Sequence, residues 1–301
     1  MFAFLRNKQS IPLGLDISSD EIRVLQLKRQ SHRFTVKKFA ALPLAPAVVV
    51  AGKIRQAEEL IQALRQLLRQ AGIKKCAVNV ALPGNAVISQ QILLPASLSL
   101  LDCEKTISTN LSRYFPGVPE SLCFDFLPLA SRNNSHHEIL VVACRQSQVE
   151  SYTAVIKSAG MQLQTLDVDK FALMRAVRFT VNTYSASDTV AMLQLGERQA
   201  ELIIFCHQAI FFNQQWQVDD ENSLLAALKN AWHLFFSSVE KKTVDYVVLS
   251  GKLSTYAPAL TAYFTSELNL KVHTANPFLE MDMAADAASF QICAGLATRG
   301  F

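Results

Sequence analysis

The sequence predicts a duplicated α/β fold whose first half carries an inserted α+β unit. Two strands joined by a short turn open the chain at residues 11–28, and the same pattern returns at residues 189–206. In both halves a third strand follows, and then helices and strands alternate. Two halves that begin alike and continue alike are typical of a duplicated α/β fold. At 301 residues the chain is long enough for about two domains.

The composition indicates a folded protein of a reducing compartment. Hydrophobic residues make up 50% of the chain and charged residues 18%, which excludes disorder. A net charge of +4 is too small for nucleic-acid binding as the main role. The sequence has neither a run of about 20 apolar residues nor the apolar core of a signal peptide. We therefore expect a cytoplasmic protein without direct membrane insertion. The six cysteines lie in apolar runs and form no C-x-x-C pair, so we expect buried thiols and no zinc site.

The first elements follow from apolar spacing. Alternation predicts strands at residues 11–17 and 21–28, with the turn-forming Ser18, Ser19 and Asp20 between them. A third strand is predicted near residues 33–40. A helix follows and ends at Gly72, because apolar residues recur at helical spacing at positions 57, 60, 61, 64, 67, 68 and 71.

Residues 30–160 are interpreted as a self-contained inserted α+β subdomain. Two of its helices are predicted from capping boxes, Ser99 with Asp102 and Ser147 with Glu150. Its later strands are predicted at residues 76–83, 87–95, 122–127 and 138–144.

The remaining residues complete two lobes. A strand at residues 161–169 and a helix capped by Asp169 lead toward the second hairpin. Beyond the hairpin we expect strands at 208–216, 243–250 and 271–275 and helices at 222–239, 258–269 and 285–297. The predicted boundaries are 1–29 with 161–187 for the first lobe, 30–160 for the insert and 188–301 for a shortened second lobe.

The first hairpin turn is a candidate phosphate and metal site. Gly14, Ser18 and Ser19 are small enough for backbone N–H groups to approach an anion. Asp16 supplies the carboxylate that would hold Mg²⁺. The alternative, that these residues only form a tight turn, stays open.

Two loops of the second half complete this candidate site. Gly196 and Glu197 lie in the turn of the second hairpin, after a strand in which Gln194 occupies the position of a second carboxylate. Glu197 could supply a carboxylate from a shifted position. Ser250 and Gly251 end a later strand and could face a base or ribose, although one glycine after a strand is also a common turn signal.

Longer segments of the sequence carry a family resemblance. Five segments resemble PilM, the actin-like family of the type IV pilus inner-membrane platform. They are PLGLDISSDEIRVLQL, ALPGNAVISQQILLPASLSLLDCEKTIS, VVACRQSQVESYTAVIKSAGMQLQTLDVDKFALMRA, VHTANPF and AGLATRG. The stretch from Ala81 to Ala176 is the specific part, because FtsA and other actin-like proteins share the first hairpin.

The resemblance implies an actin-like (ribonuclease H-like) fold in a cytoplasmic protein. It implies ATP with Mg²⁺ in the cleft between lobes, and a PilN-like bitopic membrane protein as partner, besides other pilus platform proteins. The partner's N-terminal peptide is expected to lie extended in an apolar groove between the actin-like body and the insert.

The sequence departs from the family at the nucleotide loops. Ser18 replaces a glycine, Gln194 replaces an aspartate, and Ser250-Gly251 keeps one of two glycines. The segment between Trp216 and Trp232 is shorter than in the family. We therefore expect a pilus or competence-system scaffold with a degenerate nucleotide site. The alternative is an active actin-like ATPase that switches the platform; a third interpretation, an FtsA-like filament protein, would need a C-terminal amphipathic helix.

Overall fold

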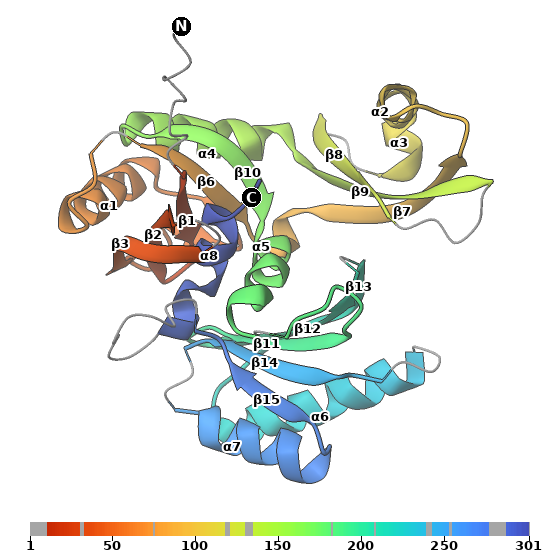
Figure 1. Ribbon diagram of the computed structural model, residues 1–301. Helices are drawn as coiled ribbons and strands as arrows, with labels where there is room; N and C mark the ends of the chain where they lie inside the picture. Colours follow the sequence, from red (N-terminus) through yellow and green to blue (C-terminus); the bar gives the residue numbers. More distant parts are fainter. Residues whose placement is uncertain are drawn as a thin grey trace, which may run out of the picture.

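The computed structural model contains two lobes and an inserted subdomain (Figure 1). It describes residues 11–300 except 31–32, 75, 118–120, 130–134, 182, 208, 239–242, 253–254 and 277–286. Within these residues, no helix combines the length and apolar character needed to cross a bilayer.

The first lobe is built on a five-stranded sheet in the order β10-β6-β1-β2-β3. The strands β1, β2 and β3 are antiparallel neighbours, whereas β1, β6 and β10 run parallel. Helices α1 (Ala57–Gln70) and α4 (Gln146–Ser158) pack against it. The strand bounds are Leu13–Ile17 for β1, Glu21–Gln30 for β2, Arg33–Pro43 for β3, Ala77–Leu82 for β6 and Gln162–Val168 for β10.

The second lobe repeats this arrangement with the order β15-β14-β11-β12-β13. Strands β11, β12 and β13 are antiparallel neighbours, and β14 and β15 run parallel to β11. The arrangement matches that of the first lobe, so the predicted duplication is confirmed. Helices α6 (Glu221–Ser238) and α7 (Ala257–Ala262) lie beside the sheet (Figure 1). The strand bounds are Val190–Leu195 for β11, Gln199–Cys206 for β12, Ala209–Gln217 for β13, Tyr246–Gly251 for β14 and Lys271–Thr274 for β15.

The insert is a three-stranded antiparallel sheet in the order β7-β9-β8. Helices α2 (Leu100–Thr109) and α3 (Leu111–Tyr114) cover one face through a core that includes Ile107, Ile139 and Val141. The strands are β7 (Ile88–Pro95), β8 (Leu122–Pro128) and β9 (His136–Arg145).

The predicted insert boundaries, 30–160, are too wide. Strand β3, helix α1, strand β6 and helix α4 all lie within that range, yet they belong to the sheet and core of the first lobe. Apolar spacing identifies strands but not their pairing, so the return of β6 to β1 left no signal in the sequence. Two short strands, β4 (Val49–Val50) and β5 (Lys53–Ile54), also lie there and pair with each other.

Helix starts agree with the sequence in part. The Ser99 cap is confirmed, because its hydroxyl accepts the Asp102 N–H at 3.2 Å. The Ser147 cap is wrong: α4 begins at Gln146 with Arg145 at the cap position, two residues before Ser147, and Arg145 makes no side-chain cap. Helix α5 (Asp169–Ala176) includes Asp169 as its first residue, with Val168 at the cap position.

Helices α5 and α8 (Gln291–Ala297) join the lobes at the centre of the molecule (Figure 1). Their residues are shared between cores, with Ala172 packing into the second lobe and Ala176 against the first. A Cβ on Gly295 would lie 1.8 Å from the carbonyl oxygen of Ala172, so the two backbones touch only because this residue is glycine. The two helices that join the lobes are therefore in direct backbone contact.

Candidate functional site

A cleft of about 560 Å³ separates the lobes, and the predicted loops meet around it. Asp16, Ser18 and Ser19 line it from the first lobe, and Gly196 and Gly251 line it from the second. The remaining two predicted residues do not line this cavity. The side chain of Glu197 is 63% exposed and pairs with Lys252. Ser250 is buried, and its hydroxyl donates to the Ala288 carbonyl at 3.2 Å.

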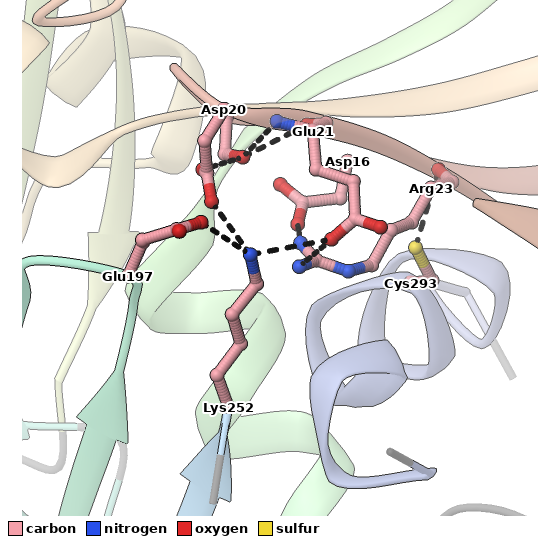
Figure 2. A network of polar contacts seen from close by, with 8 residues as sticks. Asp16, Asp20, Glu21, Arg23, Glu197, Lys252 and Cys293 are labelled. Atoms are coloured by element: carbon pink, nitrogen blue, oxygen red, sulfur yellow. Dashed lines mark hydrogen bonds and ion pairs between the residues drawn. The ribbon is translucent and has the colours of Figure 1, made fainter. Parts of the chain in front are cut away.

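The candidate metal ligand Asp16 already has a cationic partner. Arg23, seven residues later on β2, places Nη1 3.3 Å from Asp16 Oδ2, and each side chain is only 8% exposed (Figure 2). The same guanidinium also contacts Glu21. Burial raises the pKa of the Asp16 carboxyl, and Arg23 opposes that shift. An internal guanidinium thus neutralises the carboxylate expected to bind Mg²⁺.

The first turn uses its own polar groups. The Ser18 hydroxyl lies 2.7 Å from Asp20 Oδ1 and 2.8 Å from the Glu21 carbonyl oxygen, and it accepts the Glu21 N–H. The Ser18 N–H donates to the same Glu21 carbonyl at 3.0 Å. These bonds close a tight turn, so neither group points freely at a phosphate.

Lys252 bridges the two lobes at the mouth of the cleft. Its Nζ lies 3.0 Å from Asp20 Oδ2 of the first lobe and 2.8 Å from Glu197 Oε2 of the second (Figure 2). Burial alone would lower the pKa of Lys252, but hydrogen bonds to Glu197 and Asp20 raise it overall. The sequence analysis did not predict this lysine as a site residue. The one sequence feature that could have indicated it is its position directly after the Ser250-Gly251 loop.

In the second turn the Glu197 carboxylate is paired with Lys252, and Gln194 stands where another carboxylate would be needed. Gln194 pairs with Glu201 and Ser250 on neighbouring strands, and its Oε1 is buried without a hydrogen-bond partner. The Gly196 N–H donates to the Gln199 carbonyl at 2.8 Å, which closes this turn as well. Among the described residues, no three His, Cys, Asp or Glu side chains are grouped to hold a metal.

A second cavity, of about 650 Å³, lies between the insert and the first lobe. Strands β8 and β9 form one wall, with Leu140 and Val142 facing it, and β10 and α5 form the other, with Val168 and Phe171. We call this cavity the insert groove. Its charged end is organised around Asp167, which pairs with Arg175 and with Arg299.

The two similar lobes around a cleft define an actin-like protein. The sequence model described as type IV pilus assembly protein PilM matches residues 14–218, which shows that the chain belongs to the PilM family.

Two solved structures share the fold. The "PilM-PilN type IV pilus biogenesis complex" aligns with a TM-score of 0.74 at 20% identity, covering 96% of this chain and 98% of that chain. A protein of Bacteroides thetaiotaomicron with an actin-like ATPase fold aligns with a TM-score of 0.52 at 12% identity, covering 98% of both chains. The actin-like fold expected from the sequence is therefore confirmed.

The two ion pairs of the cleft should differ in their effect on stability. Removing the cation in Arg23→Met leaves a buried carboxylate unpaired and should lower the free energy of unfolding by about 3–5 kcal/mol. Lys252→Met removes a partly exposed bridge and should cost about 1 kcal/mol or less. Urea denaturation at pH 8 measures both values. The double variant Asp16→Asn/Arg23→Met should recover most of the loss, and equal losses in the two single variants would contradict this assignment.

Proposed function

We propose that the chain is a cytoplasmic scaffold of a type IV pilus or competence-pseudopilus platform at the inner membrane. It binds the cytoplasmic N-terminal peptide of a PilN-like bitopic membrane protein, and this partner ties it to the membrane. Membership of the PilM family supports the pilus role, and the similar structure with a TM-score of 0.74 is a complex between PilM and PilN.

The insert groove carries the proposal because it offers what an extended peptide needs. Strand β8 is at the end of its sheet, paired only with β9 among the described residues. Its outer edge can therefore add a peptide strand through main-chain hydrogen bonds. Leu140, Val142, Val168 and Phe171 supply apolar walls for the side chains of that peptide. The groove lies between the actin-like body and the insert, which is where the family resemblance leads us to expect the peptide.

The nucleotide site is proposed to be degenerate. Phosphate binding in such a cleft uses free backbone N–H groups and a metal held by carboxylates. Here the N–H groups of Ser18 and Gly196 are used within their own turns, and Asp16 is paired with Arg23. Lys252 spans the entrance from Glu197 to Asp20. A phosphate with its metal would have to break these contacts before binding.

The groove proposal predicts a localised loss of binding. A synthetic peptide of the partner's N-terminal segment should bind at about micromolar Kd, near −8 kcal/mol. The variant Val142→Asp puts a charge on the apolar wall and should weaken binding at least about ten-fold. Calorimetric titration gives both affinities.

The matched control for that titration is Leu101→Asp. Leu101 is 60% exposed on α2, the helix that packs on the opposite face of the insert sheet. This variant should bind the peptide as the wild type does. If the two variants bind alike, or if membrane association survives deletion of the partner's N-terminal segment, the groove is not the partner site.

The degenerate cleft predicts weak nucleotide binding. Mg-ATP should bind with a Kd above about 100 μM, equivalent to roughly −5.5 kcal/mol, and no turnover should exceed background. Calorimetry and a phosphate-release assay measure these quantities. A crystal soaked with an ATP analogue that shows Mg²⁺ between Asp16 and the phosphates would support the ATPase alternative instead.

A further inference from the structure

The insert groove and the interlobe cleft share one wall. Phe171 on α5 lines the groove, whereas Asp169, two residues earlier, lines the cleft. The segment from the end of β6 to the start of β7 also faces both cavities: Leu82 and Val87 line the groove, and Gly84 lines the cleft. These two segments, 82–87 and 167–171, therefore form a partition with one face toward each cavity.

The Asp169 carboxyl joins the two segments of the partition. Its Oδ1 accepts the Lys170 N–H at 2.6 Å, and the carboxyl also accepts the backbone N–H of Gly84. A Cβ on Gly84 would lie 2.1 Å from Lys170 Cε, so the Lys170 side chain packs directly over this glycine. Asp169 itself is not among the residues that line the groove.

Lys170 extends this connection to the second lobe. Its Nζ lies 3.0 Å from Glu201 Oε1 on β12, and the two side chains are 13% and 14% exposed. Burial and the Glu201 charge raise the pKa of Asp169 to about 7, while the Gly84 and Lys170 N–H groups and the Lys170 charge oppose this. On the α4 side the facing titratable group is Tyr152, whose pKa is raised by its burial and by the charges of Asp16 and Asp169.

We propose that Asp169 is a positioning residue for partner binding, holding the groove wall in shape from the cleft side. This inference rests on the proposed function. The ionised carboxylate accepts two backbone N–H bonds and keeps segment 82–87 against the start of α5. The protonated carboxyl binds these groups more weakly, so the Leu82 and Val87 side of the groove loosens. Partner affinity should therefore rise with pH through the Asp169 titration.

The test is the pH dependence of peptide affinity. The probe is the acetylated N-terminal peptide of the PilN-like partner, chosen or substituted to contain no histidine. If the peptide selects ionised Asp169, with its pKa of about 7, the apparent Kd should be about ten-fold higher at pH 6 than at pH 8. Asp169→Asn should bind with the weaker affinity at both pH values. The control Asp219→Asn, at an exposed aspartate outside both cavities, should keep the wild-type profile.

A second variant tests the charge relation without altering Asp169. Glu201 raises the pKa of Asp169, so Glu201→Gln should move the midpoint of the affinity profile to lower pH. A purely structural role for Asp169 would not produce this shift. If wild-type affinity does not change with pH, or if Asp169→Asn keeps the pH dependence, the positioning role is overturned and the scaffold proposal stands. If the peptide fails to bind wild-type protein at pH 8, the proposed function itself is overturned.

Discussion

The buried carboxylate of Asp16 is the constraint around which the cleft is organised. A carboxylate this deep requires a counter-charge, because burying an unpaired charge costs several kcal/mol. In this chain the counter-charge is Arg23 of the neighbouring strand, at 3.3 Å. We propose that a metal ion would have to compete with this guanidinium for the carboxylate. At the entrance of the cleft, Lys252 supplies the positive charge that pairs with Asp20 and Glu197.

Contacts within the protein connect the two lobes at the cleft and at the centre of the molecule. Backbone packing of Gly295 against Ala172 holds α8 on α5 at the centre, and both helices belong to the cores on either side. Helix α5 also forms a wall of the insert groove through Phe171. A body that presents the edge strand β8 beside this groove suits a protein that binds an extended peptide, because the strand edge can pair with the main chain of that peptide.

Much of the fold was predictable, because the duplicated hairpins carry a strong alternating pattern. The insert boundaries were not, since the alternation in β6 does not reveal that this strand lies between β1 and β10. At the site, the glycine losses at Ser18 and Ser250 and the Gln194 replacement were visible in the sequence. Arg23 and Lys252 were not recognisable as partners, because their pairing with Asp16 and Glu197 depends on strand register and on how the lobes meet. The sequence predicts only a helix cap at Asp169, and the structure is needed to place Gly84 beside it.

The most direct measurement of the central claim is hydrogen exchange of the full chain in the presence of the partner peptide and, separately, of Mg-ATP. Backbone amides at the open edge of a strand become protected when a peptide adds to it. We expect the peptide to slow exchange in Leu122–Pro128, the edge strand β8, and Mg-ATP to leave the turn at residues 17–20 unchanged. Protection of residues 17–20 by Mg-ATP, with no protection of β8 by the peptide, would contradict the scaffold role and identify a nucleotide-driven protein.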